Sequence, residues 1–464
     1  MRMKALTLRI RKRADVNMTC GPIIPQIINF SVPIFLGMLF QQFYNTVDTW
    51  VVGNFVGKNS FSAVGTLSSV TNLAISFFMG FSSGASVVIS HYFGANDKEN
   101  VSKATHTFVA ATLIMCVVLT ILGMAMIPLI LSILKSPTEV AYEQSIYMTI
   151  YFGGISGILI YNMGAAILRA IGDSSHPFMF LVVCALLNIV LDLLFVIPLK
   201  MGTAGVAYAT VLSQMISSVL VMWVLFRTKS VVRLNIKKLR LDPSILLKIF
   251  RIGLPSALQM SITSFSNIFV QSYINYFGAD VMGGWSAYNK IDQVVLLPMQ
   301  SVALATQTFV GQNLGMQNNE RARKGVRICL ILALIPTAVL IAVVVPTSRY
   351  IVKFFIDSSE EGVITYGSMF ITYITLFYLL PCFNQIYAGA LRGAGKPGIP
   401  MLTMLSSFVV FRQIYLFIMS RYISNTVMPI VLGYPAGWLV CSITMTIAYK
   451  ICFTDERLAK SSLI

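Results

Sequence analysis

The feature that most constrains this chain is a series of long apolar runs separated by short polar breaks, for example residues 178–199 and 326–345. A helix needs about 20 apolar residues to cross a bilayer, and in lipid every backbone polar group must be paired within the protein. The runs are continuous, whereas the strands of a membrane β-barrel alternate polar and apolar residues. Only 11% of the residues are charged, against about 25% in soluble domains. The sequence therefore predicts an all-α polytopic membrane protein.

Polar breaks divide the apolar runs into twelve expected membrane helices, several of them long enough to require tilting or kinking. These helices are expected at about 24–54, 61–92, 101–130, 139–169, 177–199, 204–227, 245–277, 282–313, 321–346, 361–392, 397–420 and 426–452. The basic residues before the first run imitate the start of a signal peptide. However, the apolar stretch that follows continues for about 30 residues without a small-residue cleavage site, so a retained first helix is expected.

The basic residues orient these helices, because Lys and Arg accumulate in cytoplasmic loops. With the N-terminus inside, 26 of the 34 Lys and Arg residues fall in inner segments and only 6 in outer loops. This bias predicts a multi-pass protein of the bacterial cytoplasmic membrane with both termini in the cytoplasm. It also accounts for the net charge of +17 through topology and anionic lipid headgroups. The lipid bilayer is thus an expected partner and nucleic acid is not.

The two halves of the chain repeat one another. Short motifs recur at offsets of 221 to 223 residues: Ser31–Pro33 with Gly253–Pro255, Phe93–Gly94 with Leu314–Gly315, and Leu168–Gly172 with Leu391–Gly395. Because six helices separate the copies, the halves share one orientation in the membrane, as in transporters built from parallel repeats. A structural membrane protein with duplicated halves is the alternative.

The repeat predicts five consecutive parts. They are a cytoplasmic basic tail at 1–23, an N-terminal lobe of six helices at 24–227, a cytoplasmic linker at 228–244, a C-terminal lobe of six helices at 245–452 and a cytoplasmic tail at 453–464. In such a transporter the substrate cavity lies between the lobes and alternates in access.

Ionisable side chains inside membrane helices are costly, so they are candidates for function. Gln41, Tyr44 and Asp48 share one face of the first helix, which predicts a cavity lining, although Asp48 could also be interfacial. On the fifth helix Asn188 and Asp192 also share a face. An amide oxygen and a carboxylate can bind a hard cation such as sodium, or a proton when the carboxyl is buried.

The second half carries Lys290, Asp292 and Arg412 inside expected helices. Lys290 and Asp292 are two residues apart and point to different faces, so they do not neutralise each other. Asp292 either forms a structural salt bridge with Arg412 or lines the cavity and attracts a cationic substrate. Lys290 either serves as a movable counter-charge or extends toward the lipid headgroups. Both pairs of alternatives stay open at this point.

Four segments resemble the signatures of bacterial multidrug and toxic compound extrusion (MATE) exporters. They are Pro33–Asp48 followed by Val51–Gly53, Gly80–Gly94, Ala287–Asp292 and Phe309–Gly315. The similarity spans the whole chain, includes the number of helices, and is nearer to the DinF-like branch than to the NorM-like branch. The acidic residues that NorM-like members carry on helices 7 and 10 are missing here. Both branches belong to the MOP flippase superfamily.

This resemblance implies a proton- or sodium-binding cluster in the N-terminal lobe, at Asp48, Asn188, Asp192 and Thr210. It also implies that the first helix bends at Pro33 when the cluster is protonated. The expected function is antiport, in which cationic amphipathic compounds leave as H⁺ or Na⁺ enters. The expected substrate-cavity residues are Gln41, Tyr44, Lys290, Asp292 and Arg412.

Other functions are less consistent with the sequence. A lipid-linked oligosaccharide flippase of the same superfamily is the alternative, but it needs several cationic side chains in its cavity. An enzyme is not expected, because no HExxH motif occurs and the three histidines, His91, His106 and His176, lie near expected loops. No nucleotide-binding GxxxxGK[ST] motif occurs either, so no cofactor is expected beyond the coupling ion. The seven Cys residues show no CxxC spacing, which argues against a metal site. The chain is expected to act as a monomer.

Overall fold

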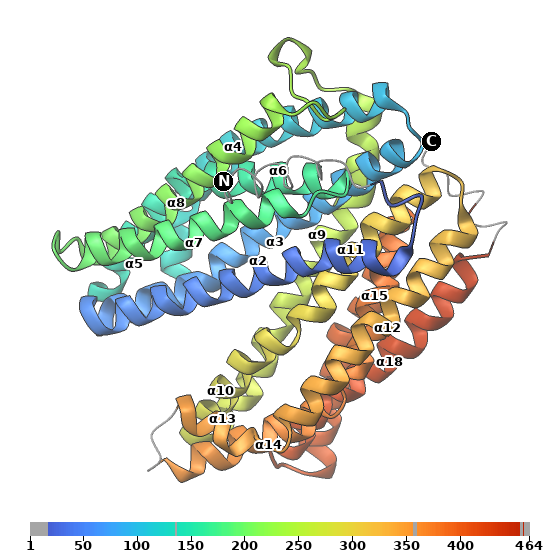
Figure 1. Cartoon of the computed structure of the whole chain (residues 1–464). Coiled ribbons are helices and arrows are strands. Elements are labelled where there is room, and N and C mark those ends of the chain that lie inside the picture. Colours follow the sequence, from blue (N-terminus) through green and yellow to red (C-terminus); the bar gives the residue numbers. More distant parts are fainter. Residues whose placement is uncertain (1–16, 135–136, 356–359, 455–457, 459–464) are drawn as a thin grey trace, which may run out of the picture. The chain divides into compact units, whose positions relative to one another are not determined.

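The computed structural model describes residues 17–134, 137–355, 360–454 and 458. Over these residues the regular secondary structure is entirely helical, and the chain forms two compact units (Figure 1). Unit 1 comprises Val32–Gly253, and unit 2 comprises Met18–Ser31 together with the chain from Leu254 onward. Most of the predicted basic tail at 1–23 and of the tail at 453–464 lies outside the described residues.

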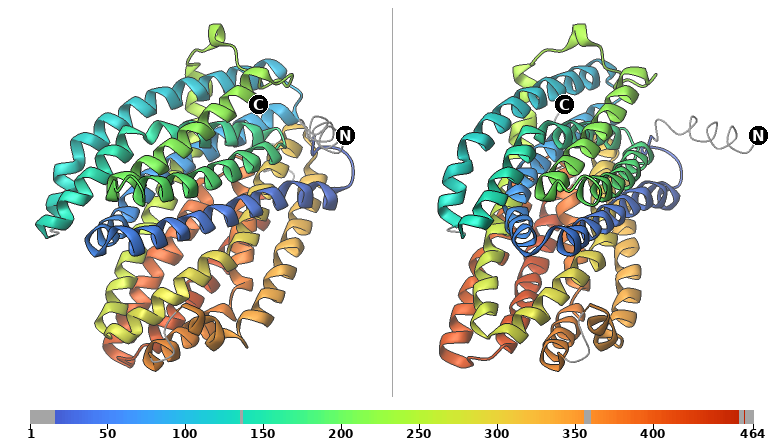
Figure 2. Two further views of the ribbon diagram at one scale, coloured as in Figure 1. Left: turned by 60° about the vertical axis from the view of Figure 1, so that its left-hand side comes forward. Right: turned by 90° about the vertical axis from the view of Figure 1, so that its left-hand side faces the viewer.

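Unit 1 is a bundle of long apolar helices. Its elements are α2 (Ile23–Val51, from Val32 onward), a π-helical turn (Val52–Val56), α3 (Lys58–Gly94), α4 (Lys98–Leu134), α5 (Thr138–Gly153), α6 (Ile155–Ala170), α7 (Ser175–Val196) and α8 (Gly202–Arg227). Helix α8 packs against α6 and α7, and α3 packs against α5 and α6. The blue-to-green helices of this unit run side by side in both views of Figure 2. Residues of α2, α3, α5, α6 and α8 line the pocket described below.

Unit 2 repeats this plan. Its elements are α9 (Pro243–Tyr276, from Leu254 onward), α10 (Ala279–Val295), α11 (Leu297–Gly315), α12 (Asn319–Val344), α13 (Ser348–Phe355), α14 (Glu361–Thr375), α15 (Leu379–Gly393), α16 (Gly398–Leu405), a π-helical segment (Ser406–Phe411), α17 (Arg412–Ile418), a second π-helical turn (Met419–Ile423) and α18 (Met428–Cys452). Helix α10 packs against α14, and α15 packs against α11 and α18.

The number of membrane spans agrees with the prediction. Among the described residues ten helical segments are long and apolar enough to cross a membrane, or twelve when each of two bent pairs is one span. The bent pairs correct the prediction of continuous helices at 139–169 and 361–392. Helices α5 and α6 meet at 45°, and α14 and α15 meet at 54°.

The broken helices have local causes. The first bend falls at the Gly153–Gly154 pair, and glycine pairs are common sites of helix kinks. In the second, Pro381 offers no N–H group to the carbonyl of Phe377, so the helix cannot continue regularly. The helix predicted at 282–313 is likewise interrupted at Leu296, where Pro298 cannot donate to the carbonyl of Val294.

The repeat seen in the sequence recurs in the backbone conformation. Positive φ angles occur at Gly57 (127°) and Gly278 (93°), and at Asn96 (57°) and Gln317 (60°), both pairs separated by 221 residues. The next residues also correspond. The side chain of Asp97 accepts a hydrogen bond from the N–H of Asn100 at the start of α4, and that of Asn318 caps α12 through the N–H of Arg321, both at 3.0 Å. Equivalent turns therefore start equivalent helices.

Helices α2 and α9 are shared between the units in the same manner. The division of α2 falls before Val32 and that of α9 before Leu254, in each case just ahead of a proline, Pro33 or Pro255. A proline leaves the carbonyl four residues earlier without its helical donor. Both helices remain continuous α-helices through their prolines in this structure.

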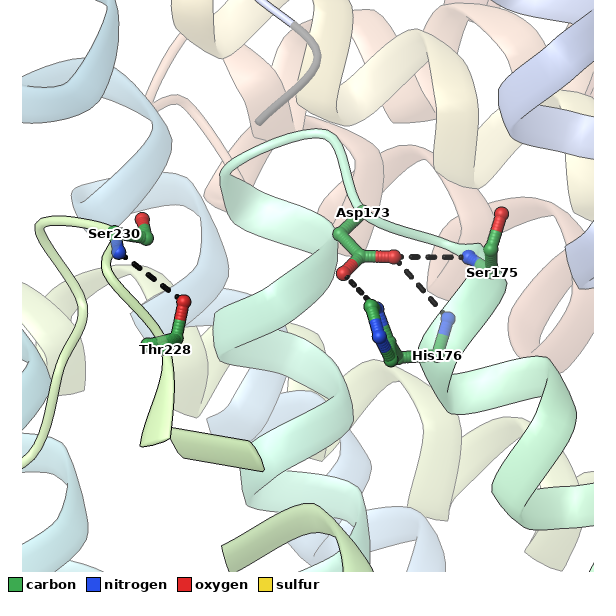
Figure 3. Close-up of polar contacts among 5 residues, drawn as sticks. All are labelled: Asp173, Ser175, His176, Thr228 and Ser230. Atoms are coloured by element: carbon green, nitrogen blue, oxygen red, sulfur yellow. Dashed lines mark hydrogen bonds and ion pairs between the residues drawn. The ribbon is translucent and has the colours of Figure 1, made fainter. Parts of the chain in front are cut away.

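Short turns connect the helices at the end of unit 1 that carries the linker. Asp173 accepts hydrogen bonds from the backbone N–H groups of Ser175 and His176, both at 3.1 Å, and from the His176 ring (Figure 3). These bonds satisfy N–H groups at the start of α7 that have no partner within the helix. At the start of the linker the N–H of Ser230 donates to the hydroxyl of Thr228 (Figure 3).

Candidate cation site and substrate pocket

A polar pocket of about 320 Å³ lies within unit 1. Four residues singled out in the sequence line it, namely Gln41, Tyr44, Asp48 and Thr210. The other lining residues are Asn45, Thr49, Thr71, Ile75, Met79, Tyr147, Tyr151, Gly154, Ile155, Ile158, Asn162, Val211 and Gln214. The α2 residues reach it because their spacing puts them on one face of the helix. Among the described residues, no Lys or Arg lines this pocket.

One glycine shapes this pocket where α6 meets α8. A Cβ atom on Gly154 would lie 2.1 Å from a methyl carbon of Val211, closer than any van der Waals contact allows. Helix α6 can therefore begin against α8 only with glycine at this position. The bend between α5 and α6 thus has a second role, because it brings Gly154 and Ile155 into the pocket wall.

A pair of carboxyl groups lies beside the pocket. Asp192 and Asn188, on one face of α7, are completely buried. Asp48 of α2 lies near both of them, while it also forms part of the pocket wall. Asp48 therefore faces two environments, the pocket on one side and the buried Asp192–Asn188 face on the other.

The buried polar atoms of this cluster have no hydrogen-bond partners among the described residues. This holds for Oδ1 of Asp48, both carboxylate oxygens of Asp192, both amide atoms of Asn188 and the hydroxyl of Thr210. Buried polar atoms in proteins are nearly always paired, and an unpaired charge in a low-dielectric interior is especially costly. A proton shared by the carboxyls or a hard cation held by these oxygens would satisfy them.

Tyrosines complete the surroundings of the cluster. Tyr147 interacts with both Asp48 and Asp192, and its ring stacks on that of Tyr151 with centroids 6.0 Å apart. Sequence reasoning missed both tyrosines and the neighbouring Gln214. The spacing of Tyr147 and Tyr151, four residues apart on one helix face, was the available signal.

Unit 2 contains the other candidate carboxyl, and it is partnered. The hydroxyl of Tyr288 donates to Oδ1 of Asp292 at 3.0 Å, and the hydroxyl of Tyr378 donates to the same oxygen. Tyr378 lies at the bend between α14 and α15, so two interrupted helices meet at this carboxyl. A cluster of aromatic rings surrounds the group, including Trp285 and Trp438.

The ion pair between Asp292 and Arg412, left open by the sequence, is not formed. Arg412 is 4% exposed and donates instead to Oγ of Ser266 at 3.1 Å and to Oδ1 of Asn267 at 2.8 Å. Its guanidinium lies 4.8 Å from the ring centroid of Tyr434, within the range of a cation–π contact. The side chain of Lys290 is exposed. Asp292 and Arg412 thus have separate sets of partners.

No cluster of three or more His, Cys, Asp or Glu residues that could hold a metal ion occurs in the part of the chain that the structure describes. The residues of unit 1 offer a different ligand set, two carboxylates with an amide and a hydroxyl. Carboxylate, carbonyl and hydroxyl oxygens suit hard cations rather than transition metals.

Comparisons with known proteins place the chain in a family. The MatE family model matches residues 33–194 and 255–418, one copy in each half. The chain is 28% identical over 408 residues to the probable multidrug resistance protein YpnP of Bacillus subtilis, covering 88% of this chain and 91% of that protein. It is 27% identical over 440 residues to YoeA of the same organism, also named a probable multidrug resistance protein, covering 93% and 94%.

A solved structure shares the fold. It is described as the outward-facing conformation of a multidrug resistance MATE family transporter of the MOP superfamily. Its TM-score is 0.89 at 24% identity, over 96% of this chain and 99% of that one. The predicted all-α fold and the resemblance to the MATE family are thereby confirmed. Members of this family are membrane transporters rather than enzymes, and the paired matches correspond to the two repeats. The chain belongs to the MatE family of multidrug and toxic compound extrusion transporters.

Proposed function

We propose that this transporter is a secondary active antiporter that exports cationic amphipathic compounds in exchange for inward H⁺ or Na⁺. The observation that carries the proposal is the set of buried oxygens on Asp48, Asp192, Asn188 and Thr210 that have no hydrogen-bond partner in the described part of the chain and lie beside the pocket. Two adjacent carboxyls cannot both stay ionised and unaccompanied in such a site. The cluster therefore takes up a proton or a cation in part of the transport cycle.

Asp48 provides the coupling in this proposal, because it belongs both to the pocket wall and to the buried pair. A cationic compound in the pocket is attracted to the ionised Asp48, whereas a proton or sodium ion at the pair neutralises the same carboxyl. The two ligands therefore compete for one group, and inward movement of one favours outward movement of the other. One charge entering with the membrane potential supplies about 2.3 kcal/mol per 100 mV.

The pocket suits the proposed cargo in its chemistry. Tyr44, Tyr147 and Tyr151 offer aromatic surface, and Met79 offers an adaptable apolar contact. A wall without Lys or Arg among the described residues is less suited to the phosphates of a lipid-linked oligosaccharide. Two relatives carry the name probable multidrug resistance protein, which agrees with the export of a range of compounds.

Alternating access in this proposal uses the two units as its moving parts and Pro33 as the bending point of α2. The division of α2 just before this proline is consistent with such a role. Asp292, Lys290 and Arg412 are proposed to contribute to substrate binding from unit 2, with Asp292 attracting the cation within its aromatic surroundings. We place both termini in the cytoplasm of a bacterial cell and take the monomer as the working unit.

Purified protein in liposomes tests this function. An imposed sodium or proton gradient should drive a fluorescent organic cation across the membrane. Repeating the assay in sodium-free buffer identifies the coupling ion. The Asp192→Asn variant serves as the uncoupled control, because an asparagine at this position of the buried pair holds neither a dissociable proton nor a full negative charge. An intact protein that moves no dye under either gradient would refute the antiport proposal.

A further inference from the structure

The linker between the two halves lies where three membrane spans end. Residues 228–242 join α8 to α9, whose spans run over Gly202–Arg227 and Pro243–Tyr276. The span of α4 begins beside it at Lys98. In Figure 1 this segment is the yellow-green loop above α4. A short segment between two spans is confined to the boundary between membrane and water.

Hydrogen bonds to α4 hold the linker backbone in place. The N–H of Asn235 donates to Nε2 of His106 at 3.0 Å. Further along, the Thr107 hydroxyl accepts from the N–H of Asp242 at 3.2 Å and donates to the carbonyl of Arg240 at 3.4 Å. Both α4 residues are at most 2% exposed. The linker therefore has a defined shape, and its side chains project from a fixed backbone.

This shape creates a basic pocket of about 510 Å³. Five of its lining residues are basic: Lys98 and Lys103 of α4, and Lys237, Lys238 and Arg240 of the linker. The one acidic lining residue, Glu99, is engaged by Lys103 at 2.7 Å. Convergent ammonium and guanidinium groups are strong hydrogen-bond donors to phosphate oxygens. The charge bias of cytoplasmic loops depends only on how many basic residues a loop carries. Here the five basic residues also line one cavity.

Exposed apolar side chains lie next to these basic ones. Ile236 is 70% exposed and Leu241 is 41% exposed, and they flank the three basic linker residues in the sequence. On α8, Trp223 is 57% exposed, and Arg227 lies over its ring at 5.9 Å. Basic side chains interleaved with exposed apolar residues, together with an interfacial Trp, characterise segments that rest in the headgroup region.

We propose that the linker pocket binds the phosphate-bearing headgroup of an anionic glycerophospholipid and so anchors the linker of the two halves to the membrane. The basic side chains hold the phosphate, and Ile236 and Leu241 reach toward the acyl chains. Inorganic phosphate shares the headgroup chemistry but makes no use of the apolar residues. The proposal is independent of the antiport function, because it involves neither Asp48 nor Asp192.

The test compares two variants of the full-length protein with equal loss of charge. The first, Lys237→Gln/Lys238→Gln/Arg240→Gln, removes the basic linker side chains. The matched control, Lys200→Gln/Lys353→Gln/Lys450→Gln, removes three exposed charges elsewhere. Binding of labelled phosphatidylglycerol and of labelled phosphatidylcholine to the detergent-solubilised proteins is measured by fluorescence titration.

A basic residue near an anionic surface contributes about a fivefold change in binding. We therefore expect the linker variant to bind phosphatidylglycerol about tenfold or more weakly than the control, with no change for phosphatidylcholine. The preference for phosphatidylglycerol should also decrease as salt is raised. Each single variant, Lys237→Gln or Lys238→Gln, should lose about twofold to fivefold, which keeps the test valid if the triple variant does not fold.

Two results would overturn the proposal. One is an unchanged preference for phosphatidylglycerol in the linker variant or, where that variant does not fold, in both single variants. The other is displacement of phosphatidylglycerol by inorganic phosphate at equal concentration, which would assign the pocket to free phosphate.

Discussion

The two units share one plan but treat their buried polar groups in opposite ways. In unit 1 the atoms of Asp192 and Asn188 are buried without a hydrogen-bond partner among the described residues. In unit 2, Asp292 accepts two tyrosine hydroxyls, and Arg412 donates to neighbouring side chains and lies over an aromatic ring. The two units therefore share their helices and turns but differ in their polar centres.

The difference separates a site that needs a ligand from one that is satisfied by the protein. A proton or cation strongly stabilises buried carboxyls that have no hydrogen-bond donor, and this stabilisation is lost when the ligand leaves. A carboxyl that already accepts two tyrosine hydroxyls is stabilised less by a bound proton or cation. We infer that the coupling ion acts in unit 1 and that unit 2 contributes to substrate recognition and stability.

The largest expected effect comes from Asp192→Asn. Gradient-driven dye transport should fall to the level of protein-free liposomes, because the cluster can no longer load and release a proton or cation. Thermal unfolding should occur at an unchanged or higher temperature, since an unpartnered buried charge has been removed. Transport and melting curves measured on the same preparation check both parts. Resistance to toxic cations that persists undiminished in cells producing this variant would contradict the assignment.

The corresponding change in unit 2, Asp292→Asn, should have a different signature. It weakens two tyrosine hydrogen bonds, so the free energy of unfolding should fall by about 1 kcal/mol. Dye binding should weaken about fivefold, since one negative charge is lost, while transport remains coupled to the gradient. Equilibrium dye titration provides the measurement, and Tyr378→Phe is its control for the lost hydrogen bond alone. An unchanged dye dissociation constant would remove Asp292 from the substrate site.

The two prolines allow a smaller comparison within the repeat. Pro33→Ala restores a backbone donor in α2 and should slow turnover several-fold without weakening dye binding, because the helix resists bending. Pro255→Ala makes the same change in α9, and its effect on turnover should be smaller if unit 1 alone binds the coupling ion. Transport rates measured at a saturating dye concentration distinguish the two variants. Equal slowing by both substitutions would indicate that the units move in equivalent ways.

The smallest effect concerns the caps of α4 and α12, where an aspartate and an asparagine occupy equivalent positions. The backbone N–H of Asn100 donates to Asp97 and holds the pKa of its carboxyl below the usual range. Asp97→Ala should cost about 1 kcal/mol at neutral pH. This loss should shrink as the pH falls through the lowered pKa, because the wild-type carboxylate becomes protonated.

Asn318→Ala, the matched change in α12, should cost a similar free energy at every pH, because an amide does not titrate in this range. Melting temperatures of the two variants between pH 3 and pH 7 are the measurement. A parallel pH response in both variants would show that the charge of Asp97 does not contribute.

Much of the fold followed from the sequence, because the apolar runs and the motifs that repeat along the chain can be recognised without knowledge of the packing. The bends at Gly154 and near Pro381 did not, since glycine and proline also occur within continuous helices such as α2. Pro33 itself shows this limit, because whether a proline bends its helix depends on the packing around it.

The site was predictable only in part. Periodicity put Gln41, Tyr44 and Asp48 on one face, and the resemblance to the family supplied Thr210. Tyr288 lies four residues before Asp292 on α10. Tyr378 comes from the bend between α14 and α15, and its approach to Asp292 depends on how α10 and α14 pack. No local pattern states that Tyr378 rather than Arg412 is the partner of this carboxyl.

The most direct test of the central claim is the affinity of the purified protein for a fluorescent organic cation, measured against pH and sodium concentration. Competition for Asp48 and Asp192 predicts that the dissociation constant rises up to about tenfold per unit decrease in pH, or in proportion to sodium. Asp192→Asn should weaken this dependence, because only Asp48 of the pair can still be neutralised, and Asp292→Asn should leave it intact. A dissociation constant that depends on neither ion in the wild type would contradict the account.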